Sequence, residues 1–244
     1  MLLHSGVSDH AMWDGVAPVL ARSHTVVRYD LRGYGSSSPP TAGFRHTDDL
    51  VDLLTHLGIS EAALVGNSLG GRVALDLAWA MPATVTRLVL LAPPLGGWKW
   101  SAPFRDYIAA EEAALDAGDI DGALRINLDM WIRGPARPWS QALRALADRV
   151  AGPMRISLIN QQAIEGQHLD ERTPPAAEHL AEVRQPTLVG VGDQDVADFI
   201  AIAEHLAATI PAARAVRFAG AGHLIPLERP GEVADGLARF LGPG

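Results

Sequence analysis

Three side chains in the sequence stand where a nucleophile, a base and an acid can be brought together. Ser68 lies in the segment GNSLGG, residues 66–71, which follows an apolar run and precedes a helical pattern. Glycines on both sides of the serine permit a very tight strand-to-helix turn. The N-terminus of the following helix favours a developing negative charge. This context favours a nucleophilic serine over an ordinary glycine-rich turn in which Ser68 only caps the helix.

A serine hydroxyl needs a base to become a nucleophile, and the base needs an orienting acid. His223 ends the segment GAGH, residues 220–223, and Asp195 ends GDQD, residues 192–195. Each segment follows a predicted strand, and the carboxyl ends of parallel strands open on one crevice. The chain order serine, aspartate, histidine is one in which such triads occur. Asp193 competes with Asp195 for the role of the acid, and the sequence favours Asp195.

The elements that must position these residues alternate between strands and helices. Apolar, β-branched runs predict strands at residues 1–4, 25–30, 62–67, 87–92, 187–191 and 214–218. Helical patterns lie at residues 11–21, 47–57, 69–80, 199–209 and 232–241. This alternation predicts an α/β fold with a mostly parallel, open sheet and helices on both of its faces.

One long segment interrupts the alternation. Residues 95–180 contain no convincing strand and carry helical patterns at 104–117, 120–132, 140–150 and 154–168. Glycine and proline separate these helices, as at Gly152-Pro153. The sequence therefore predicts a core domain made of residues 1–94 and 181–244, with a helical insertion at residues 95–180.

Composition narrows the classes of function. The chain of 244 residues has 20 Lys and Arg against 28 Asp and Glu, a formal net charge of −8. This balance disfavours nucleic acids and anionic membrane surfaces as partners. The absence of cysteine excludes disulfides, thiolate metal sites and a cysteine nucleophile. No phosphate-binding loop, dinucleotide fingerprint or zinc-binding helix motif occurs, so neither a cofactor nor a metal is expected. Without a recognisable leader or long apolar run, a cytoplasmic protein is expected.

The motifs taken together resemble the α/β-hydrolase superfamily, in particular its capped esterases and 3-oxoadipate enol-lactonases. The resemblance rests on DLRGYGSS at residues 30–37, GNSLGG at 66–71, PTLVGVGDQD at 186–195 and GAGH at 220–223. It runs from Met1 to about Leu241. It implies a triad of Ser68, Asp195 and His223, and a cap formed by residues 95–180.

The resemblance also implies an oxyanion hole made of two backbone N–H groups. One belongs to Leu69, the residue after the nucleophile. The other is expected from Gly6 in the segment His4-Ser5-Gly6, where the family usually has glycine in place of Ser5. His4 itself is expected to hold this loop rather than to act in catalysis.

The family normally has two further strands before the one that begins at Met1. Their absence leaves residues 25–30 as a poorly protected sheet edge. Two hypotheses follow: the natural chain is longer, or this edge pairs with a second copy to form a homodimer.

Aromatic and apolar residues predict the substrate pocket. Trp131, Trp100 and Met130 from the insertion, with Leu224 next to the histidine, are the candidate binding residues. The expected function is a serine hydrolase that cleaves an ester or lactone of a small, mainly apolar substrate through an acyl-enzyme on Ser68. The same triad also suits a thioesterase, a C–C bond hydrolase or a cofactor-free perhydrolase. A non-catalytic receptor for a small ligand is the alternative from another class.

Overall fold

A parallel sheet forms the centre of the molecule. The computed structural model describes residues 1–167 and 176–243. Its five strands lie side by side in the order β1-β2-β3-β4-β5, and every pairing is parallel. The strands are β1 (Leu2–Leu3), β2 (Ala62–Asn67), β3 (Val85–Leu91), β4 (Thr187–Gly192) and β5 (Ala213–Phe218). The predicted α/β class with an open parallel sheet is confirmed.

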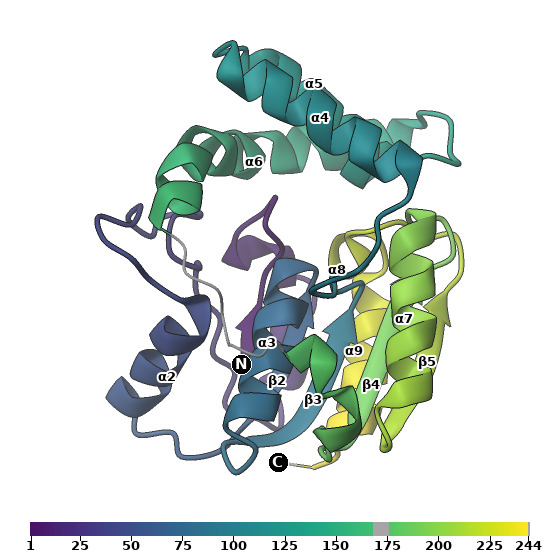
Figure 1. Ribbon diagram of the computed structural model, residues 1–244. Helices are drawn as coiled ribbons and strands as arrows, with labels where there is room; N and C mark the ends of the chain where they lie inside the picture. Colours follow the sequence, from purple (N-terminus) through teal and green to yellow (C-terminus); the bar gives the residue numbers. More distant parts are fainter. Residues whose placement is uncertain (168–175, 244) are drawn as a thin grey trace.

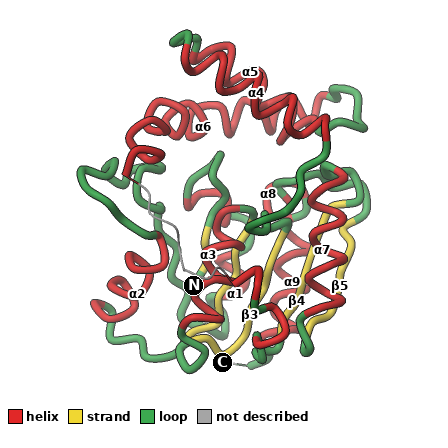
Figure 2. The backbone as a smooth tube through the Cα atoms, viewed as in Figure 1, coloured by secondary structure: helices red, strands yellow, loops and turns green. Residues whose placement is uncertain are grey.

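Helices cover both faces of this sheet (Figures 1 and 2). On one face α3 packs on β2 and β3, α7 packs on β4 and β5, and α2 packs on α3. The opposite face carries α9, which packs on α1. These helices are α1 (Ala17–Leu20), α2 (His46–His56), α3 (Leu69–Ala80), α7 (Ala197–Thr209) and α9 (Pro230–Leu241).

The strand β3 shows why both faces must be covered. Leu88 and Leu90 belong to the apolar cluster that contains α3 and α7, whereas Val89 and Leu91 belong to the cluster that contains α9. None of the four is more than 1% exposed. A strand that is apolar on both sides has to lie between two layers of helices.

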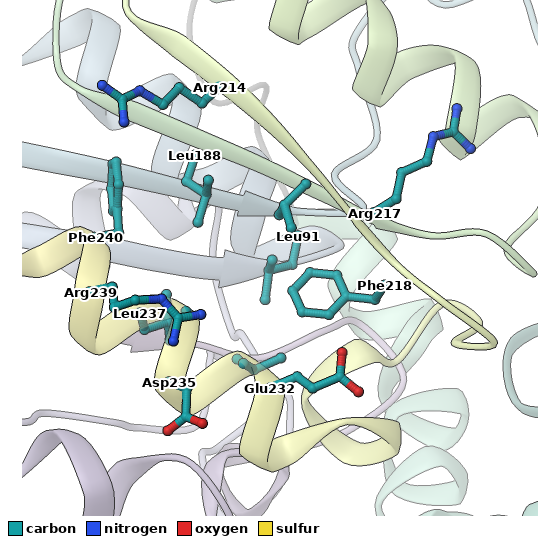
Figure 3. A pocket seen from close by; sticks show the side chains of 13 residues that line it. Leu91, Leu188, Arg214, Arg217, Phe218, Glu232, Asp235, Leu237, Arg239 and Phe240 are labelled. Carbon is teal, nitrogen blue, oxygen red and sulfur yellow. The ribbon is translucent and has the colours of Figure 1, made fainter.

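The α9 layer leaves part of its face open. A groove of about 460 Å³ lies between β5 and α9, and Leu188 and Phe218 form part of its wall (Figure 3). Arg214 and Arg239 lie beside it together with Glu232 and Asp235, so its charges are mixed. None of the predicted site residues lines this groove.

The strand predicted at residues 25–30 is wrong. This segment forms a single bridge, between Leu2 and Arg28, and the Leu2 N–H donates to the Val27 carbonyl at 2.8 Å. A ladder needs successive backbone partners on its neighbour, and β1 is only two residues long. Residues 25–30 therefore do not offer a regular edge strand for pairing with a second copy. The homodimer stays a prediction, which a solution mass measurement can test.

Two helix predictions are also wrong in detail. The helix expected at residues 11–21 is divided into a 3₁₀ turn (His10–Trp13) and α1, with Pro18 in the first turn of α1. The helices expected at 140–150 and 154–168 form one continuous helix, α6 (Gln141–Gln167), with Pro153 inside it; residue 168 lies outside the described residues. Val150 and Met154 on either side of the proline are buried. Their packing outweighs the backbone hydrogen bond that the proline cannot donate.

The chain between β3 and β4 carries the remaining long helices. They are α4 (Ala102–Asp116), α5 (Ile120–Leu128) and α6, and a π-turn (Asp129–Arg133) follows α5. In Figure 1 they lie as a separate group above the sheet. In the described residues of 95–180 the structure contains no strand. No helix in the described part of the chain is both long and apolar enough to span a bilayer.

Candidate active site

Ser68 lies at a sharp turn between β2 and α3. Its backbone has φ 51° and ψ −118°, a conformation that residues other than glycine rarely adopt. A Cβ atom at Gly66 would lie 2.1 Å from the Gly70 carbonyl oxygen, and one at Gly70 would lie 2.4 Å from the Leu3 carbonyl oxygen. Only glycine fits at both positions. The turn therefore fixes Ser68 at the N-terminus of α3, at the carboxyl end of the sheet.

His223 and Asp195 form a buried pair at the same end of the sheet. The His223 Nδ1 atom lies 3.0 and 3.1 Å from the two carboxylate oxygens of Asp195. The two side chains are 2% and 0% exposed. The Val196 N–H donates to Asp195 Oδ1 at 2.7 Å, which fixes the carboxylate in turn. With Nδ1 facing a carboxylate, Nε2 is the nitrogen left for proton transfer.

Asp193, the competing acid, has a different environment. It is exposed, and its Oδ1 accepts hydrogen bonds from the Gly220 N–H at 2.7 Å and from the Gln194 side chain at 3.2 Å. These contacts tie the loop after β4 to the loop after β5. The structure thus places Asp195, and not Asp193, against the His223 ring.

Asn67 connects the Ser68 turn to the His223 loop. Its side-chain amide donates to the Leu91 carbonyl at 2.8 Å and to the His223 carbonyl at 3.2 Å. The Ser68 N–H also donates to the Leu91 carbonyl, at 2.8 Å. The residue next to Ser68 therefore holds the backbone of His223 directly. No role for Asn67 was predicted, because its two acceptors lie far away in the sequence.

Gly6 and Leu69 lie next to each other. A Cβ atom at Gly6 would lie 3.6 Å from Leu69 Cδ2, and the Gly70 N–H donates to the His4 carbonyl at 3.0 Å. Among the described residues, neither the Gly6 nor the Leu69 N–H has a hydrogen-bond partner. Two free N–H groups beside a serine at a helix N-terminus are suited to binding an oxyanion.

His4 holds the loop that carries Gly6. Its Nδ1 donates to the Ser5 carbonyl at 2.7 Å, and its Nε2 accepts from the Leu31 N–H at 2.9 Å. This pattern requires the neutral ring with the proton on Nδ1. Burial lowers the pKa of His4 below its ordinary value, and hydrogen bonding to the Ser5 carbonyl opposes the shift without cancelling it.

Two aromatic rings pack on His223. The Trp131 ring lies 4.3 Å from the imidazole, and the Phe199 ring lies 4.5 Å from it (centroid distances). Trp131 comes from the π-turn after α5 and Phe199 from α7. The sequence singled out Trp131 but not Phe199, since a phenylalanine early in a helix gives no sign that it packs on the His223 ring.

A hydrogen-bond network fixes Trp131. Its indole N–H donates to the Tyr107 hydroxyl at 2.9 Å and to Asn127 Oδ1 at 3.0 Å. The Tyr107 hydroxyl donates to the same Asn127 oxygen at 2.8 Å. Burial, with the nearby charge of Glu111, raises the pKa of Tyr107 well above its usual value. The hydroxyl therefore stays protonated, and Trp131 is held with its ring against His223.

The other predicted binding residues lie at different depths. Trp100 packs on Phe104 and Phe199 at centroid distances of 4.4 and 5.7 Å, one ring removed from His223. Met130 is half-buried against the apolar cluster that includes Trp131. Leu224 is 0% exposed and lies within that cluster.

One group of possible metal ligands occurs among the described residues. Asp9, His10 and Asp30 each offer a ligand atom, all within 4.8 Å of one another. One oxygen of each carboxylate already accepts a hydrogen bond, Asp30 Oδ1 from the His10 N–H and Asp9 Oδ1 from the Ala11 N–H. The group contains none of the predicted catalytic residues, and we assign no metal to it.

Comparison with known proteins gives the class. The model of the alpha/beta hydrolase family matches residues 1–236, and the chain belongs to this family. A solved hydrolase from Pseudomonas aeruginosa PA01 is 29% identical with a TM-score of 0.77, over 99% of this chain and 88% of that one. The enol-lactonase from Burkholderia xenovorans LB400 shares the fold at 23% identity and a TM-score of 0.76, over 98% of this chain and 89% of that one.

Curated relatives match over shorter stretches. The 2-hydroxymuconate semialdehyde hydrolase of Pseudomonas sp. (strain CF600) is 42% identical over 98 residues, which is 37% of this chain and 35% of that protein. The chain spans 28% of the length of the first curated relatives that it matches, which are mycobacterial proteins described as uncharacterized.

Proposed function

We propose that this chain is a serine hydrolase that cleaves an ester or lactone of a small, mainly apolar substrate. The observation that carries the proposal is the buried Asp195–His223 pair at the sheet edge where the strained turn presents Ser68. Membership of the alpha/beta hydrolase family and likeness to a solved hydrolase at 29% identity support hydrolysis as the reaction class.

The reaction follows from the roles of these groups. Ser68 Oγ attacks the carbonyl carbon while His223 Nε2 takes its proton. Asp195 holds the Nδ1–H and stabilises the imidazolium. The N–H groups of Gly6 and Leu69 bind the oxyanion of the tetrahedral intermediate. His223 then protonates the leaving oxygen, and a water molecule activated by His223 releases the acyl group from Ser68.

The helices α4 to α6 act in this proposal as the cap over residues 1–94 and 181–244. Trp131 and Phe199 supply an apolar wall next to His223, with Met130 and Trp100 behind them. Such a wall favours apolar acyl or alcohol groups over charged ones. The triad alone does not distinguish esters and lactones from thioesters, C–C bonds or peracid formation, so the substrate panel must include them.

Covalent labelling tests the proposal. A fluorophosphonate should label the wild type at Ser68, and Ser68→Ala should abolish labelling and lower kcat by about 10³-fold or more on any substrate of the panel. The panel contains aryl esters of graded chain length, lactones, thioesters, a substrate with a hydrolysable C–C bond and an assay of peracid formation. Ser60→Ala, at an exposed serine, is the matched control and should behave as wild type. An unlabelled, inactive wild type that binds small apolar ligands would favour the receptor alternative.

A further inference from the structure

The turn after Trp131 touches both of the loops that carry the proposed acid and base. Gly134 has φ 72°, and a Cβ atom there would lie 3.0 Å from the carbonyl oxygen of Gln194, the residue before Asp195. The Arg137 guanidinium donates to the carbonyl of Gly220, in the His223 loop, at 3.3 Å. Residues 134–137 therefore connect the helices between β3 and β4 to both loops.

Arg137 is anchored within its own turn. Its Nε donates to the Arg133 carbonyl at 2.8 Å, and its Nη2 donates to the Ile132 carbonyl at 2.8 Å. The side chain is only 13% exposed. These bonds leave one edge of the guanidinium to face the core of the protein.

That edge binds Glu228, the last residue of α8 (Ile225–Glu228). Arg137 Nη1 donates to Glu228 Oε2 at 2.5 Å, and Nη2 donates to Oε1 at 3.3 Å. The Glu228 side chain is 5% exposed. A buried guanidinium–carboxylate pair is tolerated when the geometry is bidentate and the remaining donors and acceptors are satisfied, as they are here.

Glu228 also binds the backbone of the His223 loop. Its Oε1 also accepts the N–H of Gly222, the residue before His223, at 3.0 Å. A Cβ atom at Gly222 would lie 2.2 Å from Arg137 Nη2, so the backbone passes directly against the guanidinium. The ion pair thus holds the peptide from which His223 projects.

We propose that Arg137 and Glu228 are positioning residues that fix His223 against Asp195. Because Arg137 belongs to the helical segment, the same contact makes the alignment of the pair depend on how this segment is seated on the core. The catalytic consequence rests on the proposed function, whereas the alignment itself can be measured without any substrate.

The exposed pair Arg217–Glu204 provides a matched control. It joins β5 to α7, as a single ion pair between side chains that are 49% and 63% exposed. It contacts neither Gly222 nor Arg137. Substituting it removes an arginine–glutamate pair without touching the His223 loop.

Two readouts test the proposal on Arg137→Met, Glu228→Gln and the control Arg217→Met. The first is the low-field proton resonance of the His223 Nδ1–H, assigned by its loss in His223→Gln. The second is the rate at which a fluorophosphonate labels Ser68. We expect Glu228→Gln to slow labelling about tenfold and Arg137→Met about a hundredfold, because small displacements of a catalytic group have effects of this size. Both should shift or broaden the resonance, and Arg217→Met should change neither readout.

The outcomes separate the two proposals. If Glu228→Gln and Arg137→Met fold and keep the wild-type resonance, the positioning role is refuted, whatever happens to labelling. If Arg137→Met fails to fold, Glu228→Gln decides alone. This variant should fold, because its amide oxygen can still accept the Gly222 N–H while the charge that pairs with Arg137 is removed. If wild type is not labelled but the resonance moves in both variants, the proposed hydrolase function falls and the positioning role stands.

Discussion

The Ser68 turn and the helical segment α4–α6 are held in place by different means. At the turn, main-chain atoms touch main-chain atoms, and neither Gly66 nor Gly70 has room for a methyl group. Side chains make most of the polar contacts between the helical segment and the rest of the protein. The Ser101 hydroxyl donates to Asp198 Oδ2 at 2.5 Å, and the Asn160 side chain donates to the Gly33 carbonyl at 2.9 Å.

This difference has a consequence for how each region tolerates change. A backbone-to-backbone contact cannot be relieved by a new rotamer, so the position of Ser68 is fixed for any sequence that folds this way. Side-chain contacts can be exchanged one at a time. The proposed substrate pocket can therefore vary through the helical segment while the turn stays constant.

Gly66→Ala puts this contrast to its most severe test and should have the largest effect. The new methyl group would overlap the Gly70 carbonyl, and we expect a loss of about 3 kcal/mol or more in the free energy of unfolding. Urea unfolding measures it. Gly236→Ala in α9, where a Cβ atom meets nothing within 4 Å, is the control and should be neutral or stabilising by up to about 1 kcal/mol. Equal effects at the two glycines would contradict the steric account.

Trp131→Phe tests the hydrogen-bond network inside the helical segment. The variant keeps a ring beside His223 but removes the N–H that donates to Tyr107 and Asn127. We expect a loss of about 1–2 kcal/mol in the free energy of unfolding, the usual effect of disrupting a buried hydrogen-bond network. Thermal and urea unfolding check this value. A loss as large as that of Gly66→Ala would show that the segment is no more tolerant than the turn.

Burial of His4, which follows β1, predicts that the free energy of unfolding depends on pH. Its folded-state pKa is lowered by burial, so the folded protein binds this proton less readily than the unfolded chain. The neutral His4 ring therefore stabilises the fold fully above the ordinary histidine pKa of about 6.5. As the pH falls below that value, the free energy of unfolding decreases by at most about 1.4 kcal/mol per pH unit. Urea unfolding between about pH 8 and pH 5, on both sides of the ordinary histidine pKa, measures how the free energy of unfolding changes with pH.

The control for His4 compares two histidine substitutions. His4→Gln should flatten the acid slope, whereas His56→Gln, at an exposed position at the end of α2, should leave it unchanged. An unaltered slope in His4→Gln would mean that other groups carry the acid sensitivity.

The smallest effect is expected on the outer side of the helical segment. Arg155 in α6 pairs with Asp121 in α5, whose side chain is 69% exposed. Water screens such a pair, so Arg155→Ala should leave the urea midpoint unchanged within error. A clear shift would show that the α5–α6 contact depends on this pair and would narrow the difference between the two regions.

The turn was predictable because its requirements are local. Glycines before and after Ser68, an apolar run before them and a helical pattern after them specify β2 and α3, and both elements lie where the sequence placed them. The strand at residues 25–30 failed because it needs a long enough neighbour, which the two residues of β1 do not supply. The break at Pro153 failed because burial on both sides of the proline sustains α6.

The sequence by itself determined the parallel α/β order and the residue types available for catalysis, since hydrophobic periodicity and glycine spacing act over a few residues. Only the tertiary structure decided that Asp195 rather than Asp193 faces His223, that Trp131 and Phe199 pack on its ring, and that Arg137 and Glu228 hold its loop. Each of these contacts joins segments that are distant in the chain. Their geometry follows from how complete layers pack, which no local pattern encodes.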